Sequence, residues 1–384
     1  MTRTRLVGGS IGILASGGLS VLGAMLVTSG RVPAVRTEWA LALMAFVQIQ
    51  AVGLTCARLG VDGLVLARIR ELGAAPLDLR RHRWTRSLPV AVVTGGLGWW
   101  NWGTWGGLAL IASVLMDVES SVLYAKAAGL GRFGNITIAS LANYPLFYAL
   151  TLSAWLAGTM GPEVGYTSFV ISSAIRLTWL KLTEFTSPGA STWRVSAEWR
   201  LAAQQPVNFW LFRSDQLLLG IVNARISSTE LLGYFFLCRL TEVVAAVSVA
   251  LGPVVHPAAW DALLDPAKRR PWLPWVALVA LGLLAAPTAY IFLSEPELRP
   301  KLGLLLPFGI CCNLVLASNF STYIFMRQGR VGALLWTSLV ATVPGAVVAT
   351  FAFVRSELGL LAWVVPVQLA SFAALSARAR VIKA

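Results

Sequence analysis

The stretch FWLFRSDQLLLGIVNARISSTELLGYFFLCRLTEVVAAVSVALGPVVHPA, residues 209–258, decides the fold class of this chain. It holds two apolar runs of roughly 20 residues each, and a helix needs about that length to cross the hydrocarbon core of a bilayer. A short polar turn at 223–230 separates them. Each run also carries an arginine and a carboxylate, Arg213 with Asp215 and Arg239 with Glu242. The stretch therefore predicts two membrane-spanning helices that contain charged groups.

The composition of the whole chain supports an all-α integral membrane protein. Of its 384 residues, 57% are hydrophobic and 12% are charged, whereas a soluble domain carries about 25% charged residues. The chain has two histidines and four cysteines, and none of them form a cluster with metal-ligand spacing. We therefore expect no metal site and no cofactor.

The apolar runs predict about twelve transmembrane helices in two sets of six. The first set is Leu6–Ser29, Trp39–Leu66, Leu88–Trp100, Gly106–Tyr124, Phe133–Leu156 and Tyr166–Leu180. The second set is Ala203–Val222, Leu231–Pro253, Trp272–Leu293, Leu302–Ser318, Val331–Val354 and Leu358–Ser376. A polar cytoplasmic linker, 183–202, is expected to join an N-terminal six-helix lobe, 1–182, to a C-terminal one, 203–384. Two such lobes around a central cavity are a common plan of transporters.

The basic residues orient these spans. Of the 31 lysines and arginines, 21 fall on one side of the predicted spans, six on the other and four within them. Such a bias follows the positive-inside rule, so we expect both termini in the cytoplasm. The same placement explains the net charge of +14 without nucleic acid as a partner. The basic loop Arg68–Arg86 is interpreted as an orientation signal that contacts anionic lipid headgroups.

Three segments carry a resemblance to a known family. Ser214–Asp215, Leu232–Gly233–Tyr234 and the small-residue run ending at Pro253 resemble the seventh and eighth helices of Wzx-type polysaccharide flippases. These O-antigen flippases belong to the MATE-like multidrug/oligolipid/polysaccharide exporter superfamily. The segment AKAAGLGRFGN, 125–135, is similar to their loop between helices four and five, and LGVDGL, 59–64, to the end of their second helix.

The resemblance implies two six-helix lobes that form a V around a central cavity. It also implies a function: alternating access would flip an oligosaccharide linked to undecaprenyl diphosphate across the bacterial inner membrane for surface polysaccharide biosynthesis. The partners would be this lipid-linked oligosaccharide, membrane lipids and other polysaccharide-assembly membrane proteins. A MATE-like drug antiporter is the first alternative. An integral-membrane polysaccharide polymerase is the second, but no acid/base or histidine motif supports it. We therefore expect no catalytic residue and no enzyme.

Four arginines inside the predicted spans are candidates for binding the diphosphate or the glycan. A charge at the bilayer centre costs roughly 2.5–3.5 kcal/mol on insertion scales, so such residues usually face a protein interior or a cavity. A guanidinium presents a planar fork that suits phosphate. The alternative is that these arginines bridge helices through carboxylates. The four are Arg58, Arg176, Arg213 and Arg239.

Five acids inside the spans are candidates for coupling transport to an ion, because a carboxylate near the midplane can alternate between protonated and ionised states. They are Asp62, Asp117, Glu119, Asp215 and Glu242. Asp62 lies four residues after Arg58, and Glu242 three after Arg239, so each can also pair along its own helix. Asp215 lies two residues after Arg213 and faces another side of the helix, so it needs a partner elsewhere. The identity of the coupling ion, whether proton or sodium, stays open, as does coupling itself.

Overall fold

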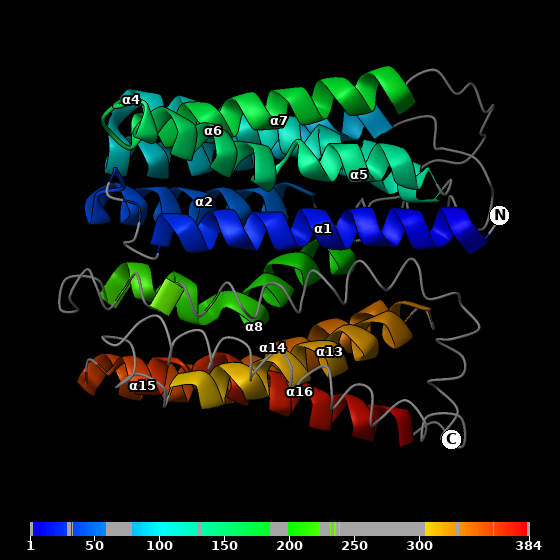
Figure 1. Ribbon diagram of the computed structural model, residues 1–384. Coiled ribbons are helices and arrows are strands. Elements are labelled where there is room, and N and C mark those ends of the chain that lie inside the picture. The colour runs from blue at the N-terminus through cyan, green and yellow to red at the C-terminus, as the bar shows by residue number, and fades with distance from the viewer. Residues whose placement is uncertain are drawn as a thin grey trace. The chain divides into compact units, whose positions relative to one another are not determined.

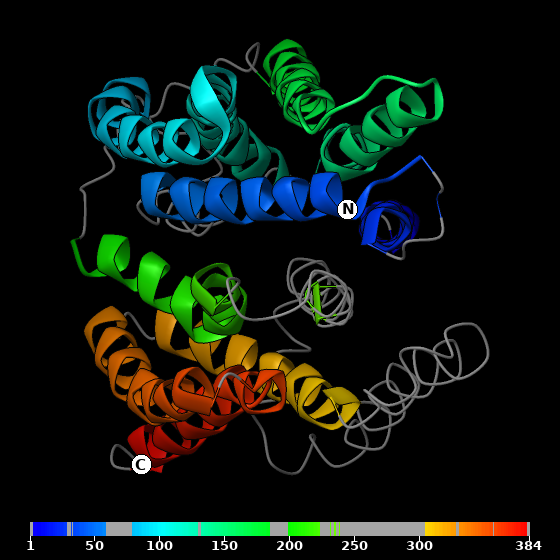
Figure 2. The same cartoon turned by 90° about the vertical axis from the view of Figure 1, so that its left-hand side faces the viewer.

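The computed structural model describes residues 3–28, 32, 34–58, 79–129, 132–184, 199–222, 231, 234–235, 238, 304–327, 330–355 and 357–381. Within these ranges the regular secondary structure is helical and includes no strand. The chain divides into two compact units, Met1–Phe209 and Trp210–Ala384. Figures 1 and 2 show the helices of both, and each unit is described by itself.

Unit 1, Met1–Phe209, is a helical bundle. Helices α2 and α7 pack against α4, while α1 packs against α5 and α6. The start of α8 follows α7 in the chain. The bounds are α1 (Arg3–Thr28), α2 (Thr37–Arg58), α4 (Leu79–Gly129), α5 (Phe133–Leu141), α6 (Tyr144–Leu156), α7 (Glu163–Glu184) and α8 (Trp199–Val222).

Helix α4 is a hairpin of two arms, because its backbone leaves helical geometry at Trp102 and Gly103. Gly103 has a φ of 71°, a conformation that favours glycine. The arms approach so closely that a Cβ atom added at Gly107 would lie 2.8 Å from the carbonyl oxygen of Gly95. Small residues permit such close packing of membrane helices, where hydrophobic burial between them contributes little. The two arms contain the third and fourth predicted spans.

The first arm of α4 begins earlier than its predicted span. The helix starts at Leu79 rather than Leu88, so the arginines of 80–86 lie on a helix and not in the expected loop. This part of the helix is polar, so apolar runs in the sequence do not predict it. The fifth predicted span also differs, because it is broken at Ala142 and Asn143 into α5 and α6. Pro145, which has no N–H to donate, lies in the first turn of α6.

In the described residues, unit 2, Trp210–Ala384, contains the rest of α8 and four further helices. Helix α16 packs against α13 and α14, around buried residues that include Leu211, Leu369 and Phe372. The twelfth predicted span is broken at 362–363 into α15 and α16. The bounds are α13 (Leu305–Arg327), α14 (Val331–Arg355), α15 (Leu358–Leu361) and α16 (Val364–Val381). The eighth and ninth predicted spans lie almost wholly outside the described residues, so the count of twelve stays a prediction.

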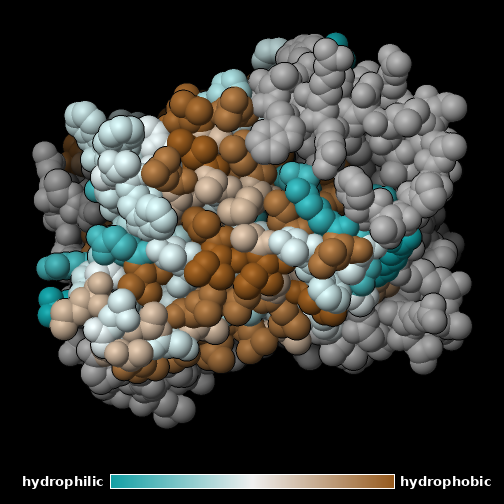
Figure 3. Space-filling view, turned by 90° about the horizontal axis from the view of Figure 1, so that it is seen from above, coloured by the Kyte–Doolittle hydropathy of each residue, from teal (hydrophilic) through white to brown (hydrophobic). Residues whose placement is uncertain are grey.

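Long apolar helices confirm the predicted class, an all-α integral membrane protein. Five stretches of the described residues are long and apolar enough to cross a membrane: Thr37–Arg58, Ser87–Ala127, Phe133–Leu156, Val331–Arg355 and Leu358–Arg378. One face of α14 exposes large apolar side chains from Trp336 to Val354. At 1.5 Å per residue this face is about 27 Å long, close to the thickness of a bilayer core of about 30 Å. Figure 3 shows a broad hydrophobic band on one side of the molecule.

Candidate functional site

The nine charges singled out in the sequence divide between the two units. Asp62, Arg239 and Glu242 lie outside the described residues. The other six are described and belong to two separate groups. One group lies in unit 1 and contains Arg58, Asp117, Glu119 and Arg176; the other lies in unit 2 and contains Arg213 and Asp215.

The unit 1 group centres on Asp117, near the middle of the second arm of α4. The Nε2 of Gln50, on α2, donates a 2.8 Å hydrogen bond to the Oδ2 of Asp117. The Nη1 of Arg176, on α7, lies 3.6 Å from the other carboxylate oxygen. Arg58 also interacts electrostatically with Asp117. Gln50, Asp117 and Arg176 are all buried, so three helices meet around a charge that water scarcely reaches.

Arg176 bridges helices, which is the second of the two roles considered for the embedded arginines. Its guanidinium faces Asp117 and also lies over the ring of Tyr124, 5.6 Å from the ring centre. Both contacts are made within unit 1. A buried charge that loses its only strong partner destabilises a protein by about 3–5 kcal/mol, so this pair holds α4 and α7 together. A binding role for Arg176 stays a prediction.

Glu119 has a partner of its own on α7. Its Oε1 lies 3.2 Å from the Nζ of Lys181, and the lysine side chain is 40% exposed. An ion pair at such a solvent-accessible position contributes little, about 0–1 kcal/mol. Asp117 and Glu119 therefore point to different partners, in agreement with their separation by two residues along the helix.

The unit 2 group centres on Asp215, which is buried on α8. The hydroxyl of Tyr234 donates a 2.9 Å hydrogen bond to the Oδ2 of Asp215, and the thiol of Cys238 lies 3.8 Å from the same oxygen. The other carboxylate oxygen, Oδ1, is buried and accepts no hydrogen bond from the described residues. Arg213, two residues earlier, interacts electrostatically with this carboxylate. In the part of the chain that the structure describes, one oxygen of this buried carboxylate is thus held and the other accepts no hydrogen bond.

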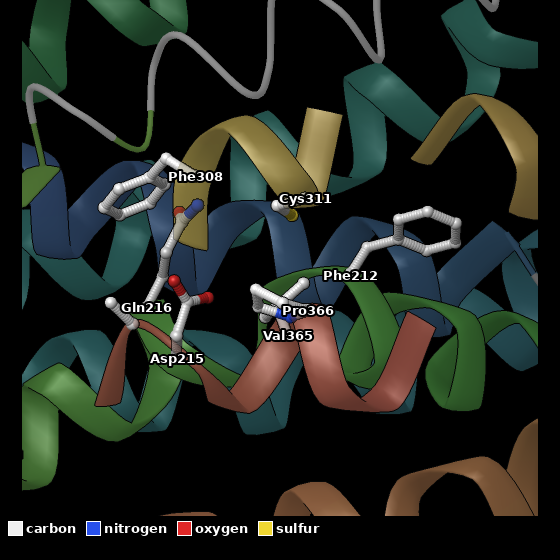
Figure 4. A pocket seen from close by; sticks show the side chains of 8 residues that line it. Phe212, Asp215, Gln216, Phe308, Cys311, Val365 and Pro366 are labelled. Carbon is white, nitrogen blue, oxygen red and sulfur yellow. The ribbon is translucent and has the colours of Figure 1, made fainter. Parts of the chain in front are cut away.

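A small pocket opens beside this carboxylate, with room for about one water molecule. In Figure 4 its lining comes from α8, which is green, α13, which is yellow, and α16, which is red. Hydrophobic side chains dominate the lining, and Asp215 is its charged residue. The lining residues are Phe212, Asp215, Gln216, Phe308, Cys311, Ala362, Val365 and Pro366.

Two helices are interrupted at this pocket. The backbone of α8 is non-helical at Arg213, with φ −142° and ψ 16°. The α15–α16 break follows Leu361, and Pro366 has no N–H to offer the carbonyl group of Ala362. Interrupted helices near the midplane are where transporters commonly bind substrates and coupling ions, because free backbone groups are tolerated there only beside a cavity.

Three polar partners of these groups were not among the candidate site residues predicted from the sequence. They are Gln50, Tyr234, which was noted only within the resembling segment Leu232–Gly233–Tyr234, and Gln368. The Nε2 of Gln368 donates a 3.1 Å hydrogen bond to the hydroxyl of Ser214. In the sequence, Gln50 and Gln368 could have been noticed because each is a polar residue within an apolar span. Among the described residues, no group of three or more His, Cys, Asp or Glu side chains could hold a metal ion.

The comparison with known proteins points to one class of transporter fold. No family model and no curated protein matches the chain. A eukaryotic MATE transporter, AtDTX14, is similar in structure, with a TM-score of 0.67 and 13% identity over 99% of this chain and 95% of that one. The MATE multidrug transporter DinF-BH gives a TM-score of 0.65 and 13% identity over 99% and 95%. This chain has the MATE transporter fold.

A further neighbour has the same fold. It is an outward-facing multidrug resistance MATE transporter of the MOP superfamily, with a TM-score of 0.60 and 13% identity over 99% of this chain and 95% of that one. The fold that the resemblance implies therefore agrees with the structure. The Wzx flippase subgroup remains a hypothesis.

Proposed function

We propose that this chain is a proton-coupled membrane transporter that exports small amphipathic molecules by alternating access. Three observations support the proposal: the MATE transporter fold, the apolar spans, and a pocket at two interrupted helices where one carboxylate oxygen accepts no hydrogen bond from the described residues. The proposal depends most on the pocket and its carboxylate oxygen. The drug antiporter, which was the alternative at the sequence level, fits the structural neighbours at least as well as the flippase.

Asp215 is the best candidate for the coupling group in the described residues. A coupling group must take up a cation on one side of the membrane and release it on the other. The Oδ1 of Asp215 can accept a proton, while Tyr234 holds the second oxygen in place. A hard metal cation takes several oxygen ligands, whereas a proton needs only one. Among the described residues the pocket is lined by one carboxylate, and this favours the proton.

Transport of ethidium, a fluorescent amphipathic cation, into proteoliposomes tests the proposal. Such a dye suits the test because two of the structural neighbours are multidrug transporters. We expect an imposed pH gradient, but not a sodium gradient, to drive ethidium movement by the wild type.

Two variants locate the coupling group in the same assay. Asp215→Asn should abolish the response to pH. Glu357→Gln, which neutralises an exposed acid before α15, should preserve it. Unaltered pH-driven transport by Asp215→Asn would exclude Asp215, and no ethidium transport under either gradient would overturn the exporter proposal.

A flippase for lipid-linked oligosaccharide is the second candidate, and Arg213 favours it. This arginine lies at the non-helical point of α8, beside the pocket that contains Asp215. Its guanidinium can bind a diphosphate through two parallel hydrogen bonds, which a lysine ammonium cannot do. Arg176 supports the flippase less, because its guanidinium faces Asp117.

Two measurements test the flippase. Deletion of the protein should cause a lipid-linked glycan to accumulate on the cytoplasmic leaflet of the host membrane. Arg213→Lys should then slow flipping although it keeps the positive charge. If no glycan accumulates, or if Arg213→Ala flips at the wild-type rate, this candidate fails.

A further inference from the structure

Gln368, on α16, is a fully buried polar residue within an apolar span. Its Nε2 donates a 3.1 Å hydrogen bond to the hydroxyl of Ser214 on α8. Its Oε1 is also buried and accepts no hydrogen bond from the described residues. An amide buried with incomplete hydrogen bonding costs free energy, which a methionine of similar size would avoid. The stability of α16 therefore does not explain a glutamine at this position.

The hydrogen bond from Gln368 reaches α8 at its interruption. Ser214 lies between Arg213, where the backbone is non-helical, and Asp215, whose side chain lines the pocket. An interrupted helix lacks part of its regular backbone hydrogen bonding, so contacts with neighbouring helices fix the chain there. Ser214 and Gln368 are both fully buried and belong to the same unit. The amide thus holds α8 one residue away from the acid.

Helix α14 confines the same amide from another side. It packs against α16, and its buried Gly345 leaves the space that the side chain of Gln368 occupies. A Cβ atom added at Gly345 would overlap with Cγ, Cδ and Nε2 of Gln368. Small residues let membrane helices approach this closely. Three helices therefore meet at Gln368, and its amide has a defined position.

Gln368 is also close to the pocket along its own helix. Val365 and Pro366, on α16, line the pocket together with Asp215 (Figure 4). Gln368 follows Val365 by three residues, so the two share a side of the helix. Helix α16 therefore lines the pocket and, through Gln368, holds the part of α8 that contains Asp215.

We propose that Gln368 is a positioning residue that keeps Asp215 at the pocket by holding Ser214 against α16. The inference rests on the proposed coupling role of Asp215. A coupling acid must present its carboxylate to the same small space in every cycle, and a displaced acid takes up and releases its proton less often. Loss of the Gln368 contact should therefore slow the transport cycle and leave substrate affinity unchanged.

Labelling of Cys311 by methyl methanethiosulfonate, a small thiol reagent, tests the positioning in the purified full-length protein without any substrate. Cys311 lines the same pocket, so its labelling rate reports how often the pocket opens. Gln368→Met keeps the length of the side chain but removes the amide donor. It should make labelling about 5- to 15-fold faster, the factor expected for one buried hydrogen bond. Peptide mass spectrometry separates Cys311 from the other three cysteines.

Gln204→Met is the matched control for this labelling. Gln204 is another buried glutamine on α8, and its Nε2 donates a 2.6 Å hydrogen bond to the Oδ1 of Asn208 on the same helix. The substitution removes the same chemical group but no contact with α16, so Cys311 should be labelled at the wild-type rate. Equally fast labelling in both variants would overturn the proposal.

Gly345→Ala tests the position of the amide without removing any hydrogen-bonding group. The new methyl group displaces the side chain of Gln368, so labelling of Cys311 should again become faster. In a Gln368→Ala background the same change should have no further effect, because the side chain that it displaces is missing. Equal effects of Gly345→Ala in the two backgrounds would contradict the role of Gln368.

A double variant separates positioning from stabilisation. Gln368→Met leaves the hydroxyl of Ser214 without its donor, and Ser214→Ala then removes that unpaired group. The unfolding midpoint of the double variant should therefore recover toward the wild-type value. Labelling of Cys311 should stay fast, because α8 is still not held. Wild-type labelling of Gln368→Met, or recovery of labelling together with stability, would show that Gln368 positions nothing.

Transport of ethidium gives the functional readout. Gln368→Met should lower the maximal rate while KM stays within about twofold, a split that marks an effect on the cycle and not on binding. A raised KM with an unchanged maximal rate would place Gln368 at the substrate and overturn the proposal. Absence of transport by the wild type would refute the proposed function alone, because labelling and unfolding still decide whether Gln368 holds α8.

Discussion

Asp117→Asn removes the carboxylate that faces Arg176 and leaves the arginine charge buried between α4 and α7. Leaving a buried charge without its partner costs about 3–5 kcal/mol. The reciprocal change, Arg176→Gln, should cost less, because Asp117 keeps the hydrogen bond from Gln50 and its interaction with Arg58. The double variant should cost much less than the sum of the two, since it leaves neither charge unpaired.

Thermal unfolding of the purified protein in detergent measures these differences. One kcal/mol shifts the Tm of a unit of 150–250 residues by about 2–4 °C, so Asp117→Asn should lower the Tm of unit 1 by roughly 6–20 °C. Lys181→Gln, which removes the half-exposed ion pair with Glu119, should lower it by less than about 4 °C. Additive effects of the two single changes, or a loss below about 1 kcal/mol for Asp117→Asn, would refute the reasoning that this pair joins the helices.

Three further predictions concern the hairpin, the lipid-facing surface and the pocket. Gly107→Ala should destabilise unit 1 by about 1–3 kcal/mol in the same unfolding assay, because the new methyl group meets the carbonyl of Gly95. Gly96→Ala is the control and should not destabilise the unit, because there is open space around Gly96. Val343 is 59% exposed on α14, and Val343→Arg should raise the apparent free energy of membrane insertion by about 2.5–3.5 kcal/mol. Val343→Leu is the control and should leave this free energy unaltered. Equal insertion of the two variants would contradict a lipid-facing α14. Tyr234→Phe should lower the stability of unit 2 by about 1–3 kcal/mol, because the Oδ2 of Asp215 loses its hydroxyl donor and keeps only the weak thiol donor of Cys238 among the described residues. An unchanged unfolding midpoint would argue against the Tyr234 hydrogen bond.

Much of the fold could be predicted because membrane spans are read from local composition. The predicted span Val331–Val354 agrees with α14, Val331–Arg355. The gap between the predicted spans Leu88–Trp100 and Gly106–Tyr124 agrees with the reversal in α4. Prediction failed where a helix continues in polar residues, as at Leu79. It also failed where a helix breaks inside an apolar run, as at Asn143. Hydropathy contains no information on either event.

The candidate site was predicted only in part. The embedded acids Asp117 and Asp215 were visible as charges in apolar runs, but their partners were not. Gln50 is 67 residues from Asp117, and Gln368 is 154 residues from Ser214. Such pairs depend on which helices pack together, and the spacing along the chain does not reveal this.

By itself the sequence determined that this is a helical membrane protein with costly charges inside its spans, because the hydrocarbon core demands about 20 apolar residues per helix and penalises every exception. Only the tertiary structure decided what those charges do. It joined Asp117 to Arg176 inside unit 1, and it placed Asp215 beside two interrupted helices, with one oxygen that accepts no hydrogen bond from the described residues. The physical reason is that a buried charge is neutralised by whatever lies within a few ångströms, and helix packing alone decides those neighbours.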